Sequence, residues 1–165
     1  MSKFLYIARH GEAAPGADDH ERPLTAYGER EARQTGAWLH SQGIRPDAIA
    51  SSTAIRARST AHLLAEATGF DLQRILTSRR IYDADLKYIL DLIVGYEDLF
   101  GHVLLVGHNP TFTMLAQYLA PAAPGHLPTA GLIGLRFDVD RWAEVTAGLG
   151  ETQHYFYPTQ SAAGI

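Results

Sequence analysis

The sequence contains no cysteine, which excludes disulfide bonds and thiolate chemistry. It also lacks any apolar run near the roughly 20 residues that a membrane-spanning helix requires. Basic residues number 14 against 18 acidic ones, and the resulting net charge of −4 argues against a broad surface for nucleic acid or for an acidic membrane. The chain enters its first apolar run without the basic-then-apolar segment of a secretory signal. We therefore expect a cytoplasmic protein that binds neither nucleic acid nor a membrane.

Metal-binding patterns are missing as well. The histidines show no HExxH motif or comparable paired spacing, so we expect neither a metal ion nor another cofactor. The length of 165 residues, 46% of them hydrophobic, suffices for one domain with a sizeable core. We expect a single domain over residues 1–165 with no inserted cap.

Two apolar stretches are each followed by a turn that carries a histidine. Residues 4–8 precede Arg9 and His10, and residues 103–106 lead into the turn of His108. In an open α/β sheet, ligands bind outside the carboxyl ends of the strands. We therefore expect both histidines and the arginine at the mouth of one site.

The remaining pattern alternates strand-like and helix-like stretches. The expected strands are 4–8, 47–51, 103–106, 131–139 and 142–148, the last two joined by a tight turn at 138–141. The expected helices are 25–41, a helix ending at Gly69, 85–93 and 111–119, with Thr25, Ser52 or Thr53, Asp85 and Thr111 as N-caps. Residues 72–81 are expected to be extended, and the tail from residue 152 has no clear period. The pattern predicts a three-layer α/β/α sandwich with a mainly parallel central sheet.

Three arginines stand at strand or loop ends near the expected site: Arg9, Arg22 and Arg56. The guanidinium fork suits a phosphoryl group because it donates two parallel hydrogen bonds and stays charged. Arg56 also falls in the first turn of a helix, where the helix N-terminus adds affinity for anions. Neighbouring arginines lower the pKa of a histidine, which keeps His10 neutral and able to attack phosphorus. The combination predicts phosphoryl transfer that depends on positioning and charge stabilisation.

The segments that carry these residues resemble the histidine phosphatase superfamily, whose members have the phosphoglycerate mutase-like fold. Residues 6–12 resemble its RHG signature, and residues 22–28 resemble its RPLT..G segment. Residues 51–61 are similar to its SP..RA..TA segment, with Thr53 in place of the usual proline, and residues 106–110 to its GHNP segment. Within the superfamily, the short chain and the RPLT segment look most like the SixA-type phosphohistidine phosphatases.

The resemblance implies roles for five of the residues. His10 would be the nucleophile that becomes phosphorylated. Arg9, Arg22, Arg56 and His108 would form the phosphate pocket. Of these, Arg9, Arg56 and His108 would also belong to the catalytic group.

Two further residues are candidates. Larger relatives place a glutamate after the third strand, where this sequence offers Asp83 as the general acid. Asn109 is a candidate substrate-binding residue, with fixing of the turn as its alternative role. An imidazole leaving group, with a usual pKa of about 6.5, needs less help from an acid than an alkoxide does. The missing glutamate therefore favours phosphohistidine over a sugar phosphate as substrate.

These arguments predict a metal-independent phosphatase with a phosphohistidine intermediate on His10. The leading substrate is phosphohistidine on a signalling protein of the histidine phosphotransfer type. The segment between Arg56 and His108 leaves no room for a cap, and an uncapped site suits a protein-borne histidine. One alternative is a phosphomonoesterase or mutase of the same superfamily, with a small phosphate ester as partner. A second is an inactive phosphate-binding interaction module.

Overall fold

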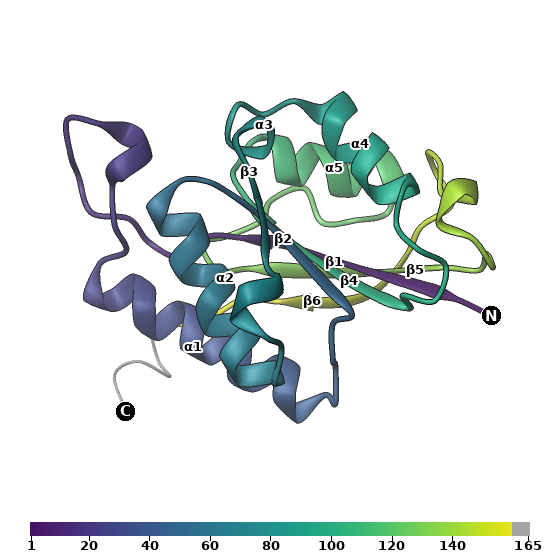
Figure 1. Cartoon of the computed structure of the whole chain (residues 1–165), viewed down its shortest axis with the longest axis horizontal. Coiled ribbons are helices and arrows are strands. Elements are labelled where there is room, and N and C mark those ends of the chain that lie inside the picture. Colours follow the sequence, from purple (N-terminus) through teal and green to yellow (C-terminus); the bar gives the residue numbers. More distant parts are fainter. Residues whose placement is uncertain (160–165) are drawn as a thin grey trace.

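The computed structural model describes residues 1–159, which form a six-stranded sheet with helices on both faces (Figure 1). The strand order is β3-β2-β4-β1-β5-β6. Neighbouring strands from β3 to β1 pair in parallel, whereas β5 pairs antiparallel with both β1 and β6. The strands are β1 (Lys3–Arg9), β2 (Ala48–Ser52), β3 (Leu76–Ser78), β4 (His102–Gly107), β5 (Leu132–Phe137) and β6 (Glu151–Phe156). The expected α/β/α sandwich with a mainly parallel sheet is confirmed.

Helices α1 and α2 cover one face of the sheet, and α3, α4 and α5 cover the other (Figure 1). The α-helices are α1 (Ala26–Ser41), α2 (Ile55–Thr68), α3 (Arg79–Tyr82), α4 (Leu86–Val94) and α5 (Thr111–Leu119). Short 3-10 helices are η1 (Asp19–Glu21), η2 (Leu72–Arg74) and η3 (Trp142–Glu144). The segment 72–81, expected to be extended, is a strand only in its centre, β3. Within residues 1–159, no helix combines the length and the apolar character that crossing a membrane requires.

Strand β1 lies between the two helical layers and is buried on both faces. Leu5 and Ile7 belong to the core cluster on the α4 and α5 side, whereas Tyr6 and Ala8 belong to the cluster under α1 and α2. None of the four is more than 2% exposed. A strand covered on both faces has a continuous apolar sequence instead of an alternating one, which explains the pattern of residues 4–8.

Two of the expected side-chain caps are present at helix starts. Thr25 accepts a hydrogen bond from the Gly28 amide, and Asp85 accepts one from the Tyr88 amide, as expected for N-caps. The other cap predictions are wrong, because α2 and α5 begin without a side-chain cap at Ala54 and Pro110. The polar side chains expected to cap these two helices, Ser52 or Thr53 and Thr111, do not do so. Two of them instead contact histidines, as described below.

The prediction of a strand at 142–148 is also wrong. The indole of Trp142 is fully buried and donates to the Phe100 carbonyl at 2.7 Å, while its backbone amide donates to Asp98 at 2.9 Å. These contacts hold the segment as η3 against the residues that precede β4, at the amino end of that strand. The antiparallel partner of β5 is instead β6, from the tail in which no period was recognised. A longer connection therefore replaces the expected tight turn at 138–141.

Gly28 allows the loop after β1 to pack directly on the first turn of α1. A Cβ at this position would lie 2.1 Å from the Glu12 carbonyl oxygen. Gly28→Ala, normally favourable in a helix, should therefore destabilise the protein by about 2 kcal/mol and reduce catalysis by displacing the loop of His10. Urea unfolding and phosphatase assays measure both effects. The control Gly125→Ala, whose Cβ would lie 3.6 Å from a flexible Gln117 side chain, should change little. Equal stability of the two variants would contradict the prediction.

Candidate active site

The pairing of β1 with β4 brings the two candidate histidines together. Arg9 and Gly107 are partners in this parallel ladder, so His10 and His108 are the next residues on adjacent strands. Their ring centroids are 5.1 Å apart. The site therefore forms at the carboxyl ends of β1 and β4 (Figure 1). From β1 the chain continues to β2 on one side of this strand pair, and from β4 it continues to β5 on the other side. Such a switch point of the strand order is where ligands bind in open α/β sheets.

His10 is held as a neutral imidazole with its Nε2 atom next to Arg56. Its Nδ1 lies 2.6 Å from the Gly11 carbonyl oxygen, which can only accept, so Nδ1 carries the proton. Nε2 then has a lone pair, which receives a long hydrogen bond from Arg56 Nε at 3.4 Å. Burial lowers the pKa of His10 to about 3, and the charges of His108, Arg56 and Arg9 act in the same direction. Nε2 is thus an available nucleophile at neutral pH.

The loop that carries His10 is fixed by buried hydrogen bonds. The Gly11 amide donates to the Thr60 hydroxyl at 3.0 Å, and the Glu12 amide donates to the buried Glu31 carboxylate at 2.8 Å. A Cβ on Gly11 would lie 2.5 Å from the Gly28 carbonyl oxygen. The small residues in the turn are therefore required by close contact between backbones, which positions the histidine.

Arg56 lies in the first turn of α2 and is only 6% exposed. Its Nε is directed at His10, and its Nη2 donates to the Asp19 carboxylate at 3.0 Å. Its Nη1 donates to the Asp19 carbonyl at 2.6 Å. A buried guanidinium beside a neutral nucleophile and a helix N-terminus is suited to an anionic group.

Two buried nitrogen atoms near His10 have no hydrogen-bond partner. They are Arg9 Nε and His108 Nδ1, and only Thr152 contributes another such side-chain atom within residues 1–159. Arg9 is otherwise bound through Nη1 to the Leu127 carbonyl at 3.2 Å. A buried donor without an acceptor is costly, so both atoms are suited to the oxygen atoms of a ligand.

The contact between His108 and Ser52 determines which nitrogen of His108 carries the proton. His108 Nε2 lies 2.7 Å from Ser52 Oγ, which already accepts a hydrogen bond from the Ala54 amide. A Ser52 hydroxyl that donates its own proton to Nε2 leaves the proton of the neutral ring on Nδ1, the unpartnered atom, where it can be donated to an anion. Burial lowers the pKa of His108 to about 4, so the neutral form is the relevant one. Ser52, expected only as a cap, is a positioning residue here.

A carboxylate that the sequence analysis did not single out lies beside this cluster. Asp19 accepts hydrogen bonds from Arg22 Nη1 at 2.9 Å and from the Tyr82 hydroxyl at 2.8 Å, in addition to Arg56. These bonds hold the pKa of Asp19 well below its usual range, with Tyr82 as the largest influence. Arg22 does not contact the histidines and is joined to Arg56 only through Asp19. No spacing rule distinguishes Asp19 from its neighbour Asp18 in the polar loop.

Aromatic side chains form the wall next to Asp19. The Tyr82 ring meets His20 edge-on at 4.8 Å between centroids and His108 at 5.6 Å. His20 Nε2 lies 2.8 Å from the Thr53 hydroxyl. Thr53, in the position where the family has proline, therefore holds an aromatic residue of the opposite loop instead of capping α2.

The two remaining candidates bind other parts of the protein with their side chains. Asn109 uses both ends of its amide within the protein, donating to the Leu127 carbonyl at 2.8 Å and accepting from the Thr113 amide at 3.1 Å. It therefore fixes the turn and the start of α5. Asp83 lies at the end of α3, with its carboxylate 3.4 Å from Arg79 at the surface. Within residues 1–159, the Asp83 carboxylate forms no hydrogen bond or ion pair with His10.

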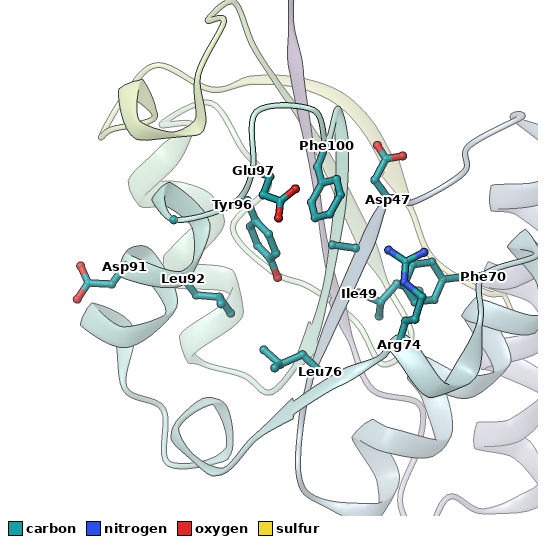
Figure 2. Close-up of a pocket in the computed structure, with 12 residues that line it drawn as sticks. Asp47, Ile49, Phe70, Arg74, Leu76, Asp91, Leu92, Tyr96, Glu97 and Phe100 are labelled. Carbon is teal, nitrogen blue, oxygen red and sulfur yellow. The ribbon is translucent and has the colours of Figure 1, made fainter.

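The cavity shown in Figure 2 is a different place in the fold. Its volume is about 480 Å³, and its lining includes Asp47 before β2 and Phe100 before β4, at the amino ends of these strands. Asp91 and Glu97 also line it, with Arg74 as a single basic residue of the lining. Acidic side chains are unfavourable for phosphate, and the cavity lies at the opposite end of the sheet from His10. Within residues 1–159, no group of three or more His, Asp or Glu side chains is arranged to hold a metal ion.

Comparison with known proteins identifies the family. The model of the histidine phosphatase superfamily (branch 1) matches residues 5–85. An uncharacterised protein of Mycobacterium tuberculosis is 34% identical over 163 residues, which cover 91% of this chain and 99% of that protein. The solved structure of a candidate phosphohistidine phosphatase SixA from Agrobacterium tumefaciens is 30% identical, with a TM-score of 0.78 over 95% of this chain and 99% of that one.

A second such SixA structure, from Nakamurella multipartitia, is 25% identical, with a TM-score of 0.81 over 96% of this chain and 98% of that one. The chain belongs to the histidine phosphatase superfamily. The expected phosphatase class and the similarity to SixA-type proteins are thereby confirmed.

The proton position on His108 predicts the effect of removing the Ser52 hydroxyl. Ser52→Ala leaves Nε2 without its donor, so the ring no longer presents Nδ1–H to an anion, and kcat/KM should fall roughly tenfold. Steady-state kinetics with a phosphatase substrate measures the loss. Ser51→Ala, which removes the neighbouring buried hydroxyl from the Ser52 carbonyl, is the matched control and should retain more activity. Similar losses in both variants would show that only packing of β2 is disturbed.

The buried neutral state of His10 predicts a pH-dependent stability. Its pKa of about 3 in the folded protein lies below the usual histidine pKa of about 6.5, so the unfolded chain binds more protons between these values. Stability is therefore complete above about pH 6.5 and is lost as the pH falls towards 3, with roughly 2 kcal/mol lost at about pH 5. Urea unfolding of wild type and His10→Gln at about pH 7.5 and pH 5 tests this. The variant should lose less stability on acidification; an identical loss would contradict the assignment.

Proposed function

We propose that this protein is a phosphatase that forms a phosphohistidine intermediate on His10, and that its substrate is phosphohistidine on a signalling protein in the cytoplasm. The observation that carries the proposal is the neutral Nε2 of His10 beside Arg56. Two further buried donors, Arg9 Nε and His108 Nδ1, have no partner within the described chain. A phosphoryl group supplies the acceptor oxygens that these donors need, and its phosphorus would lie next to the lone pair.

The reaction takes place in two transfers. The lone pair of His10 Nε2 attacks phosphorus, and the bond between phosphorus and the leaving group breaks, with its electron pair going to the leaving group. Water then attacks the phosphoryl group on Nε2, releases inorganic phosphate and returns the bond pair to the imidazole. Arg9, Arg56 and His108 stabilise the charge on the phosphoryl oxygens in both steps. Arg22 supports the pocket through Asp19, and Asn109 through the Leu127 carbonyl shared with Arg9.

The substrate class is supported by the similarity to the SixA proteins and by the protonation of the site. The candidate acid Asp83 is paired with Arg79 at the surface, and Asp19, the carboxylate next to Arg56, is held ionised, so neither suits the role of proton donor. An imidazole leaves phosphorus without the strong acid that an alkoxide requires. The arrangement thus favours cleavage of a P–N bond.

Access to the site is also compatible with a protein substrate. The segment between Arg56 and His108 forms the rest of α2, then η2, β3, α3, α4 and β4. Each of these elements belongs to the sheet or to its covering layers, as the proposal of a single uncapped domain requires. A histidine on the surface of a partner protein would then reach His10 from the side of loop 13–22.

The decisive experiment is dephosphorylation of a phosphotransfer domain that carries phosphohistidine. Wild type should release phosphate from it faster than from a panel of small phosphomonoesters, and samples quenched in alkaline detergent, in which the P–N bond is stable, should contain a phosphoenzyme. His10→Ala should show neither activity nor phosphoenzyme, whereas His40→Ala, at the exposed end of α1, should match wild type.

Other outcomes identify the alternatives. Turnover of a small ester without turnover of the phosphoprotein would indicate a phosphomonoesterase. Transfer to a second acceptor instead of water would indicate a mutase, and phosphate binding without turnover an inactive binding module.

A further inference from the structure

We infer that Asp19 is a specificity-determining residue, whose carboxylate binds the ring N–H of a phosphorylated imidazole and thereby favours P–N over P–O substrates. The inference rests on the proposed phosphohistidine substrate and assigns to one side chain the selection between leaving groups. It stands on the position of this carboxylate relative to the nucleophile, on its partners and on the aromatic side chains beside it.

The guanidinium of Arg56 links the nucleophile to Asp19. Its Nε donates to His10 Nε2 at 3.4 Å and its Nη2 donates to Asp19 Oδ2 at 3.0 Å. Nε and Nη2 form the edge with which arginine binds two oxygens of one phosphoryl group. A phosphoryl group on this edge would therefore have His10 on one side and the Asp19 carboxylate within reach of its leaving group.

Every group that faces Asp19 keeps it ionised. Arg22 and Arg56 contribute positive charge, and the Tyr82 hydroxyl donates a hydrogen bond. The bond to Asp19 raises the pKa of Tyr82, so the phenol retains its proton. The nearby ring of His20 is bound through Nε2 to Thr53, and its Nδ1 is 3.6 Å from Glu21. The Asp19 carboxylate can therefore accept a hydrogen bond, but it cannot act as a proton donor.

This charge state discriminates between the two leaving groups. In phosphohistidine, one ring nitrogen is bonded to phosphorus and the other can carry a proton. When His10 attacks, the P–N bond pair returns to the ring, and a ring protonated on the other nitrogen leaves as neutral imidazole. That N–H remains hydrogen-bonded to Asp19, and no proton needs to be transferred. An ester would instead leave as an alkoxide, which an ionised Asp19 cannot protonate and which its charge repels.

The aromatic wall suits a flat leaving group. Tyr82 lies between His20 and His108, in edge-on contact with both rings, at 4.8 and 5.6 Å between centroids. The hydroxyl of the same tyrosine is bound to Asp19. An imidazole that donates to Asp19 would therefore lie against the tyrosine ring, whereas an aliphatic alcohol offers neither a ring face nor a positive charge.

The test compares Asp19→Asn with wild type on two substrates. The first is a phosphotransfer domain carrying phosphohistidine, and the second is p-nitrophenyl phosphate, whose leaving group needs no proton. Asparagine retains size and hydrogen bonding but removes the charge. The matched control is Asp18→Asn, which makes the same charge change in the same loop at a residue whose side chain only caps η1.

The expected result is a loss of roughly tenfold or more in kcat/KM for phosphohistidine, with p-nitrophenyl phosphate hydrolysis within about threefold of wild type. Asp18→Asn should retain the wild-type ratio between the substrates. Equal losses of Asp19→Asn on both substrates would overturn the inference and make Asp19 a support for Arg56. Unchanged phosphohistidine turnover would also overturn it. Wild type that is inactive on phosphohistidine but active on p-nitrophenyl phosphate would instead refute the proposed substrate, and the inference with it.

Discussion

The parallel pairing of β1 with β4 is the constraint on which the site depends. Because Arg9 is opposite Gly107 in the ladder, the next residue on each strand is a histidine, and the two rings meet. On the other side of β4, Ser51 pairs with Val106, so Ser52 lies opposite Gly107, one residue before His108. A shift of one residue would exchange the faces of β1 and place side chains that fit the core on the α4 and α5 side in the differently shaped core under α1 and α2. The burial of β1 therefore maintains the register that aligns the catalytic groups.

Each of the three arginines of the site donates at least one hydrogen bond to an acceptor of the protein itself. Arg56 and Arg22 share the Asp19 carboxylate, whereas Arg9 is bound to the Leu127 carbonyl. The Glu31 charge opposes the effect of burial on the pKa of Arg9. These contacts hold the guanidinium groups in place before a ligand arrives, so little reorganisation is needed when a phosphoryl group binds. Burial, together with the charges of Arg56 and Arg9, lowers the pKa of both histidines and keeps them neutral.

Most of the framework follows from local patterns. The run at residues 4–8 and the caps Thr25 and Asp85 are recognisable because each depends on the residues next to it. The strand predicted at 142–148 fails because contacts with distant residues, including the Phe100 carbonyl, hold Trp142 in η3. Strand β6 was missed because only its alternating exposure, which depends on pairing with β5, identifies it as an edge strand.

The same distinction applies to the site. Each of Arg9, His10, Arg56 and His108 lies in a segment whose motif can be read from neighbouring residues. The roles of Asp19, Tyr82 and Ser52 depend on contacts across the fold, with partners 37, 63 and 56 residues away in the sequence. Local patterns therefore predict the candidate phosphate-binding residues. The side chains beside them are recognised only from contacts in the folded chain.

This division has a chemical consequence. The groups around the phosphoryl position are guanidinium ions and neutral imidazoles, which stabilise charge but are poor proton donors at neutral pH. The adjacent carboxylate is ionised, and the phenol beside it holds its proton more tightly than usual. A site of this composition can accelerate departure only of groups that leave as stable neutral molecules or weak bases. Imidazole meets that condition, so the arrangement that keeps the His10 ring neutral is also the one that would suit the imidazole leaving group of the proposed substrate.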